Sequence, residues 1–342
     1  MSTANTGAAI IDSGRTFFSG STGKWAGEQF MRAFQEGKPI SSAQLRTNAI
    51  LRNEEWIALD TDVVQGAQER MRGVADLIAA GLTTTITNGL GKTVLHYDKG
   101  GDMDPAIVSL DGITRSENDR IEYERAGLPL PIAHKDFYLN LRALEASRNG
   151  GEPLDTTYSR VAGRKVGEAV EDMLFNGGKT FGGLTVYGYT THPDRNTAGF
   201  GSNGNWSQSA KTGANILTDL FTGIAALEAD GYYGPYWLYY GGTAPGLKLA
   251  EDYKAESGDT ILQRLQATGR LSLVGTSSKL AADNVLLIQP STDVVKLIEG
   301  EPLQTVQWDV HGGFQINFKA FTIQVPLIRS DIDGNSGIFH MS

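Results

Sequence analysis

The amino-acid sequence predicts an α+β protein, and three observations lead to this fold class. Residues 155–176 carry apolar side chains at the three-to-four-residue spacing of a long amphipathic helix. Residues 212–295 alternate between helical patterns and short apolar runs that are typical of buried strands. The chain also contains 42 glycines, which favour turns, hairpins and bent strands over a bundle of helices.

Composition and charge exclude several classes of protein. The 342 residues are 40% hydrophobic and 20% charged, so the chain can bury a core in one large domain or about two. A net charge of −9 and the lack of any Lys/Arg-rich run argue against sequence-specific nucleic-acid binding. Without cysteine, the protein has no disulfide, thiol nucleophile or zinc–thiolate site. Neither a secretion signal nor an apolar run of about 18 residues is found, so no membrane span is expected.

Residues 1–48 are polar and rich in Gly, Ser and Thr. They include one short amphipathic piece, KWAGEQFMRAF, which carries Trp25, Phe30 and Phe34. The composition is compatible with a disordered leader, and equally with an arm that orders only against a neighbouring subunit.

A helix is predicted from Asn53, which can cap it, with two glutamates in the first turn where the helix dipole favours acids. Apolar residues recur at helical spacing as far as Ile78. Gly66 and Gly73 predict an interruption within this stretch.

Residues 82–132 alternate like strands, with turn signals between the strand-like runs. Pro129 and Pro131 cannot donate to a β-ladder, so the segment is an edge or an isolated ribbon. It is long, polar and poor in large apolar residues. We therefore predict a hairpin that projects from the body, has no core of its own and needs a partner to rest on.

The long helix over 155–176 has Asp155 as its predicted N-cap and Leu154 as a hydrophobic staple. It ends at Asn176 and the two following glycines, a common helix terminus. Its 22 residues predict a rod of roughly 33 Å at about 1.5 Å per residue. The predicted apolar stripe consists of Tyr158, Val161, Ala162, Val166, Ala169, Val170, Met173 and Leu174.

The second half of the chain predicts an α/β or α+β lobe over residues 212–295. A helix is expected at 214–229, ended by Gly231, and another at TILQRLQATG. The runs YWLYY and NVLLIQP predict buried strands. The segments VVKLIEG, TVQWDV, FQINFKAFTIQVPLI and GIFHMS are then expected to return as strands.

Two short motifs imitate ligand-binding loops. GLGKT at Gly89–Thr93 lacks the first glycine of a phosphate-binding loop, and the sequence after it predicts a strand instead of a helix. DIDGNSG at 331–337 has its glycine at the wrong place for a calcium loop and no following bidentate glutamate, so an Asp-Gly turn is predicted.

No constellation of catalytic, cofactor-binding or metal-ligating residues is predicted. None of the histidines is paired at helical metal-site spacing, and each is expected at the surface or in a turn. Glu168, Glu171 and Asp172 could form a carboxylate cluster, but surface ion pairing with Arg164 and Lys165 is the favoured interpretation. The five histidines are His96, His134, His192, His311 and His340.

The order of the predicted parts resembles the Hong Kong 97 phage capsid fold, which tailed-phage major capsid proteins share with encapsulin (linocin-like) nanocompartments. PIAHKDFYLNLRALEASRNGGEPLDTTYSRVAGRKVGEAVEDMLFNG is similar to the encapsulin-type approach to the spine helix, and Glu171–Gly177 keeps the family's E-D, F and G with one spacing change. ALEADGYYGPYWLYYGG resembles the start of the axial lobe, and VQWDVHGGFQINFKAFTIQVPLIRSDIDGNSGI resembles the closing strands. About 50 residues precede LRNEEWIALDTDVV, more like a phage capsid arm than like most encapsulins.

The resemblance implies a division of the chain into functional parts. These are an arm (1–50), an N-terminal helical segment (51–81), an extended loop (82–132), a peripheral domain with the spine helix (133–211), an axial domain (212–295) and closing strands that return to the peripheral domain (296–342).

The resemblance also implies a structural function without enzymatic activity, catalytic residues or cofactors. The chain is expected to be the major capsid protein of a tailed bacteriophage. It would be made in the bacterial cytoplasm and would assemble with itself, as pentamers and hexamers, into the icosahedral shell of a virion. Scaffolding, portal or decoration proteins are expected partners, and the shell would enclose double-stranded DNA without reading its sequence. The alternative is an encapsulin-type shell around a cargo enzyme. A hydrolase or nucleotide-binding enzyme on an α/β core is the disfavoured third interpretation.

Overall fold

The computed structural model describes residues 53–342, apart from several short gaps, and two short strands nearer the N-terminus. The gaps are residues 104–105, 109, 111–119, 151–155, 255–257 and 312–313. The strands β1 (Phe18–Ser19) and β2 (Lys24–Trp25) pair with each other in antiparallel fashion. The remainder of residues 1–52, and with it the predicted packing of the arm, lies outside the described residues.

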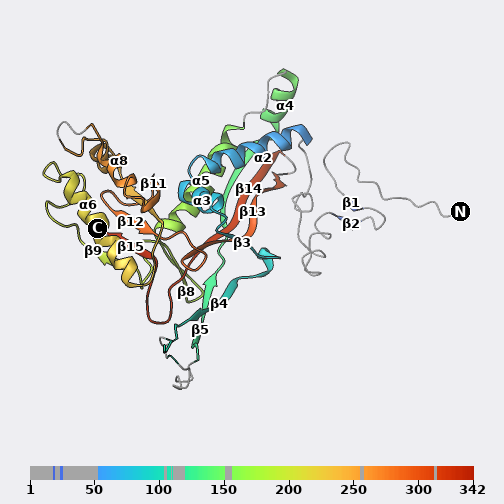
Figure 1. Ribbon diagram of the computed structural model, residues 1–342. Helices are drawn as coiled ribbons and strands as arrows, with labels where there is room; N and C mark the ends of the chain where they lie inside the picture. Colours follow the sequence, from blue (N-terminus) through green and yellow to red (C-terminus); the bar gives the residue numbers. More distant parts are fainter. Residues whose placement is uncertain are drawn as a thin grey trace.

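The described chain is an α+β fold built on two β-sheets, as predicted (Figure 1). The first sheet has the order β3 (Thr83–Thr85), β13 (Val295–Val310), β14 (Gln315–Ile328) and β6 (Ala133–Asn140). The second has the order β11 (Leu271–Ser277), β10 (Tyr236–Gly241), β12 (Val285–Ile288), β15 (Ile338–Met341) and β9 (Asn196–Ala198). A two-stranded ribbon projects from the body, and helix α4 (Leu141–Gly150) lies at the opposite end of the molecule (Figure 1).

The interruption predicted in the N-terminal helical segment is confirmed, but its position differs. The segment forms α2 (Asn53–Gln68) and α3 (Arg72–Ala79), so the break falls between the two glycines and both of them lie inside helices. Gly66 lies where α2 crosses α5 (Thr157–Phe175), and a Cβ there would overlap with the carbonyl oxygen of Arg160. Glycine at this position therefore permits the close approach of two helices. The predicted capping role of Asn53 concerns a side chain that lies outside the described part of the structure.

The predicted long helix is α5, and it packs on strands β6 and β14 of the first sheet. Its N-cap is Thr156, whose side chain makes no capping hydrogen bond, whereas Asp155 and Leu154 lie outside the described residues. From Ala162 onward the apolar stripe is buried, except for the half-buried Ala169, but Tyr158 and Val161 near its start are exposed. The glycines after the helix are both left-handed, with φ of +51° at Gly177 and +73° at Gly178, as their position in the sequence predicts.

Replacing Gly177 with Val should lower the free energy of unfolding by more than about 1 kcal/mol, because a β-carbon penalises this conformation. The new Cβ would also overlap with the backbone nitrogen of Gly188. Gly178→Ala is the matched control, since its φ is similar but its nearest neighbour would lie at 3.7 Å. Denaturant titration followed by circular dichroism compares the two, and equal stabilities would contradict the predicted clash.

The second sheet and its helices form the lobe predicted for residues 212–295. Helix α6 (Gly213–Ala229) begins after the N-cap Thr212, whose hydroxyl accepts a hydrogen bond from Asn215 N at 3.3 Å, and Gly231 follows its end with φ +85°. Residues 236–239 of β10 are buried, as are all of β12, and α8 (Ile261–Gln266) lies between them in sequence. The sequence analysis missed α7 (Thr243–Leu249) and β11.

The closing strands differ from the prediction in two respects. VVKLIEG and TVQWDV form one strand, β13, with register shifts at Glu299–Glu301 and Glu301–Gln304 where a break was expected. The last strand, β15, pairs with β12 of the lobe, whereas β13 and β14 stay in the first sheet with β6. The C-terminal residues therefore close the lobe's sheet and do not return to the sheet under α5.

The ribbon consists of β4 (Val94–Gly100) and β5 (Tyr123–Pro129), paired in antiparallel fashion. The first strand-like run of residues 82–132 is not part of it, because β3 pairs in parallel with β13 in the body. The short 3₁₀ turn η2 (Gly89–Gly91) leads directly into β4, so GLGKT precedes a strand, as predicted. The base of the ribbon does have a core within its own chain, contrary to prediction: Leu128 and Leu130 are buried against Val186, Ile323 and Val325.

The C-terminal end of α5 joins the two sheets. Phe175 makes edge-on contacts with Tyr189 and Tyr239 at ring-centroid distances of 5.5 and 5.3 Å. Glu171 is 1% exposed and accepts hydrogen bonds from Gly73 N at 2.9 Å and Ser277 Oγ at 3.3 Å. Its carboxylate thus caps α3 and links it to β11, although burial raises its pKa.

The predicted surface ion pairing on α5 is therefore wrong for Glu171. It is confirmed for Glu168, which lies 2.8 Å from Lys165 and 3.9 Å from Arg164. Asp172 pairs instead with Lys179 of the following hairpin at 3.5 Å.

Candidate functional site

The far end of the ribbon exposes a group of aliphatic side chains. Val108 and Leu110 are 96% and 107% exposed, and Met103 and Ile107 are about half exposed. An apolar group of this kind on a projecting element marks a contact site, because isolated exposed residues are common but clusters are not. We call these four residues the ribbon tip.

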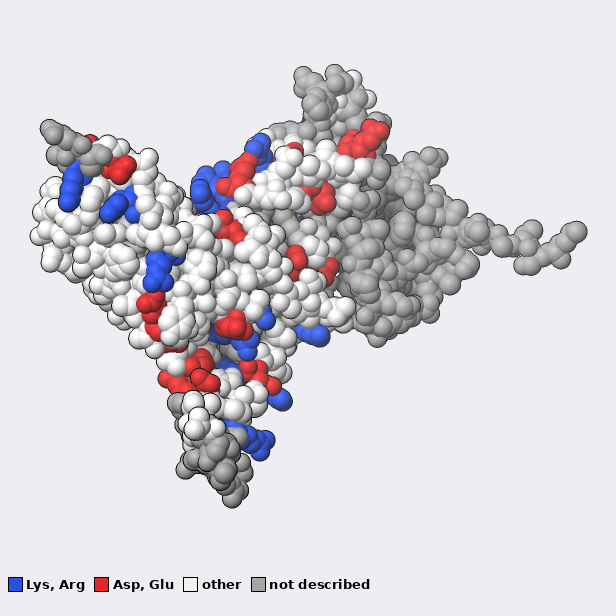
Figure 2. Space-filling view, in the orientation of Figure 1, with Lys and Arg blue, Asp and Glu red and all other residues white. Residues whose placement is uncertain are grey.

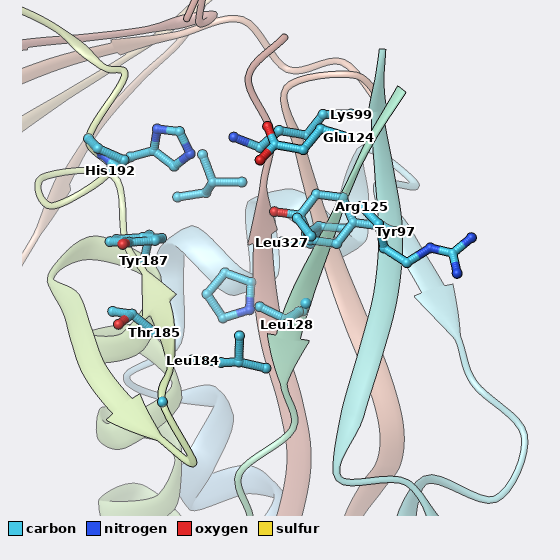
Figure 3. Close-up of a pocket in the computed structure, with 16 residues that line it drawn as sticks. Tyr97, Lys99, Glu124, Arg125, Leu128, Leu184, Thr185, Tyr187, His192 and Leu327 are labelled. Carbon is cyan, nitrogen blue, oxygen red and sulfur yellow. The ribbon is translucent and has the colours of Figure 1, made fainter. Parts of the chain in front are cut away.

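The base of the ribbon borders a cavity of about 340 Å³, shown in Figure 3. Side chains of β4, β5 and β14 line one side, including Tyr97, Leu128 and Leu327. Leu184 and Tyr187 of the hairpin β7 (Gly177–Phe181) and β8 (Leu184–Tyr187) line the other. The ribbon contacts the hairpin at Gly127 and Leu184, and the cavity opens beside this contact.

Polar groups attach the ribbon to the body beside this cavity. Lys99 Nζ donates to Ser330 Oγ at 3.0 Å and lies 3.6 Å from Asp194 Oδ2. Ser330 Oγ in turn donates to Asp194 Oδ2 at 2.5 Å.

A second surface feature is an apolar groove of about 580 Å³ between β6, α4 and the start of α5. Tyr138 and Tyr158 are 57% and 60% exposed there, and Val161 is 40% exposed. Tyr158 and Val161 are the members of the predicted helix stripe that the chain leaves exposed, and Tyr138 faces the groove from β6. The groove adjoins α4, at the opposite end of the molecule from the ribbon (Figure 1).

Two of the five histidines are not surface residues, contrary to prediction. His192 and His340 are 2% and 6% exposed, whereas His96, His134 and His311 are exposed. Arg195 lies between the buried pair: its Nε donates to His340 Nδ1 at 3.4 Å and its Nη1 to the His192 carbonyl oxygen at 2.8 Å. Burial lowers the pKa of both imidazoles to about 4, and Arg195 acts in the same direction.

Acid should therefore destabilise this protein in a specific pH window. Because the pKa of each histidine is lower in the folded chain than the unperturbed 6.5, the unfolded chain binds more protons, and stability falls as pH drops from 6.5 towards 4. The loss is at most about 3 kcal/mol per histidine. His340→Asn, whose side-chain oxygen can still accept from Arg195, should flatten the dependence of melting temperature on pH, even if it is less stable at pH 7.5. The surface variant His134→Asn should leave this pH dependence unchanged. Equal slopes of melting temperature against pH for the two variants would contradict the assignment of the acid destabilisation to the buried histidines.

The remaining sequence motifs have structural roles. DIDGNSG forms a turn in which Asn335 N donates to Asp331 Oδ1 at 2.6 Å and Gly334 has φ +88°, which confirms the predicted Asp-Gly turn. Among the described residues, no group of three His, Cys, Asp or Glu side chains could hold a metal ion, and no helix is long and apolar enough to cross a membrane. On the face seen in Figure 2, basic and acidic side chains are interspersed.

The lobe also contains a buried ion pair that was not predicted from the sequence. Lys211 Nζ and Asp219 Oδ2 lie 2.6 Å apart, at side-chain exposures of 0% and 3%. The carboxylate also accepts from Trp206 Nε1 at 2.9 Å and from Gly201 N at 3.2 Å. A signal was present, because Asp219 lies on the apolar face of the helix between Ile216 and Leu220.

Comparisons with known proteins give a consistent result. The type 1 encapsulin shell protein EncA of Myxococcus xanthus (strain DK1622) is 27% identical over 187 residues, which span 54% of this chain and 59% of that protein. The virus-like particle protein from Pyrococcus furiosus matches with a TM-score of 0.61 and 14% identity, over 85% of this chain and 99% of that one. The capsid of Myoviridae phage XM1 matches with a TM-score of 0.58 and 12% identity, over 78% and 90%.

These similarities establish the fold. The chain has the Hong Kong 97 capsid fold that phage capsid proteins share with encapsulin shells, as the order of its parts implied. Residues 46–341 also match the model of one protein family, described as a family of unknown function. Since this match extends over most of the sequence, the chain belongs to that family, DUF6260.

Proposed function

We propose that this protein is a structural shell subunit, the major capsid protein of a tailed bacteriophage, without enzymatic activity. The observation that carries the proposal is the ribbon tip, an exposed group of apolar residues at the end of a projecting element in a chain with a capsid fold. An exposed apolar group of this kind marks a contact with a second molecule, because covering it removes apolar surface from water.

The places of the two apolar surfaces support assembly into closed rings. The ribbon tip and the groove beside α4 lie at opposite ends of the molecule, so they do not meet within one chain (Figure 1). A contact between different surfaces of neighbouring copies is heterologous and generates rings when the rotation closes. Pentamers and hexamers built in this way tile an icosahedral shell.

Each part of the chain then has a role. Residues 82–132 are the extended loop that lies over a neighbour, 133–211 with α5 are the peripheral domain, and 212–295 are the axial domain around the five-fold and six-fold axes. Residues 1–50 are an arm that acts between subunits, and 296–342 complete the body.

The encapsulin alternative is supported by the 27% identity to the Myxococcus shell protein. The phage proposal is supported by the long segment before α2, which resembles a phage capsid arm. As a capsid protein, the chain works with scaffolding, portal or decoration proteins and encloses double-stranded DNA in the virion. Particles isolated from the organism that carries the gene, treated with nuclease and then extracted, should release protected DNA. Release of a single cargo enzyme without DNA would favour the encapsulin alternative.

Sedimentation velocity tests the shell function itself. The purified protein should sediment as large uniform particles or as rings. A compact 36.8 kDa monomer at every concentration would contradict the proposal.

A further inference from the structure

Packing fixes the base of the ribbon in the body, but it does less to fix the angle at which the outer part of the ribbon projects. Leu128 and Leu130 fix the last residues of β5 and the link after it in the body core. Further out, the hairpin side of the ribbon faces the cavity of about 340 Å³. Gly127 of β5 still lies against Leu184 of the hairpin, but beyond this contact the ribbon borders the cavity, where fewer packing contacts oppose a change in its angle.

At the level of this cavity, the ribbon is attached to the body through side-chain polar groups of two separate segments. Lys99 on β4 reaches Ser330, just after β14, and Asp194, in the segment between β8 and β9. Ser330 and Asp194 are themselves hydrogen-bonded, so the three side chains form a closed triangle. The Lys99 and Asp194 side chains are only 19% and 29% exposed, which limits screening by solvent and salt.

A second cation, Arg329, also attaches the ribbon to the body. Arg329 Nη2 donates to the Asp98 carbonyl oxygen at 2.9 Å, and its guanidinium lies 6.0 Å from the ring centre of Tyr97. Both contacts involve β4 next to Lys99, so the attachment is local to one level of the ribbon.

A small change in the angle of the ribbon at Lys99 produces a large displacement of the ribbon tip. Eight residues separate Lys99 from Ile107, up to about 25 Å of extended chain. A rotation of 10° at Lys99 would then move the tip by about 4 Å, which is about the length of an apolar contact and is enough to break one. The angle of the ribbon therefore decides where the tip meets its neighbour.

We propose that Lys99, Asp194 and Ser330 form a latch that sets the angle of the ribbon and thereby the curvature and diameter of the assembled shell. This inference rests on the proposed shell function. The three residues are positioning residues: they hold the ribbon at the level where it borders the cavity, and the ribbon angle in turn sets the particle size.

The test compares Lys99→Met with Lys179→Met by electron microscopy of purified particles and by melting temperature. Lys179 is the matched control: it lies on the hairpin strand β7 and forms a lysine–aspartate pair of nearly the same length, 3.5 Å, with Asp172 of α5, away from the ribbon. Lys99→Met should melt close to the wild type but give a distribution of diameters at least twice as wide, or a different mean diameter. Lys179→Met should give wild-type particles, and Lys99→Arg, which keeps the charge, should restore the wild-type diameter.

A double variant checks that the residues act together. Asp194→Asn should reproduce the effect of Lys99→Met, and combining the two should add little, because each removes the same contact. Wild-type diameters in both single variants would overturn the latch. If Lys99→Met fails to fold, Asp194→Asn carries the same test. Failure of the wild type to form particles would instead refute the shell function.

Discussion

Replacing Val108 and Leu110 together with Asp should abolish particle formation and leave a folded chain. Both side chains are essentially fully exposed in the single subunit, so their loss costs the fold almost nothing. Burying each one against a neighbour contributes roughly 1.5–3 kcal/mol, whereas burying an unpaired carboxylate costs several kcal/mol. Because every contact around a ring loses this association free energy, the remaining contacts cannot hold the ring together. Circular dichroism should match the wild type while sedimentation shows only small species.

The matched control keeps the tip apolar. Val108→Ile with Leu110→Met changes shape without adding charge, and this variant should assemble. Normal particles from the double Asp variant would show that the tip is not buried between subunits, and would contradict the heterologous contact on which the shell proposal rests.

Replacing Lys211 with Met should cost about 3–5 kcal/mol of unfolding free energy, the usual penalty for leaving a buried charge without its partner. The Asp219 carboxylate would keep its hydrogen bonds from Trp206 and Gly201 but lose the ammonium 2.6 Å away. A denaturant titration of the lobe's unfolding measures the loss.

The double variant Lys211→Met with Asp219→Asn isolates the cause. A neutral amide can still accept one of the two hydrogen bonds and leaves no buried charge, so it should recover more than half of the lost stability. A double variant as unstable as Lys211→Met alone would show that the lysine stabilises through its aliphatic packing and not through its charge.

Periodicity predicted those elements whose stability is local. The buried stripe of α5 from Ala162 onward, helix α6 with its Thr212 cap and the apolar run of β10 follow directly from the spacing of apolar residues. The left-handed glycines after α5 were equally predictable, because few other residues adopt that conformation readily.

What the sequence did not reveal depends on partners far away in the chain. Glu171 caps a helix whose first residues lie 98 positions earlier, and Arg195 reaches a histidine 145 positions later. Helical spacing says that Glu171 is near the stripe, but not that another helix begins against it. The base of the ribbon was misjudged for the same reason: Leu128 finds its core in Val186 and Ile323, which no local pattern connects to it.

The most direct test of the central claim is a cryo-electron microscopy reconstruction of the purified protein. We expect a closed icosahedral particle in which the tip residues Val108 and Leu110 of each subunit are buried against a neighbouring copy. A discrete monomer, or a particle in which those side chains remain in solvent, would contradict it.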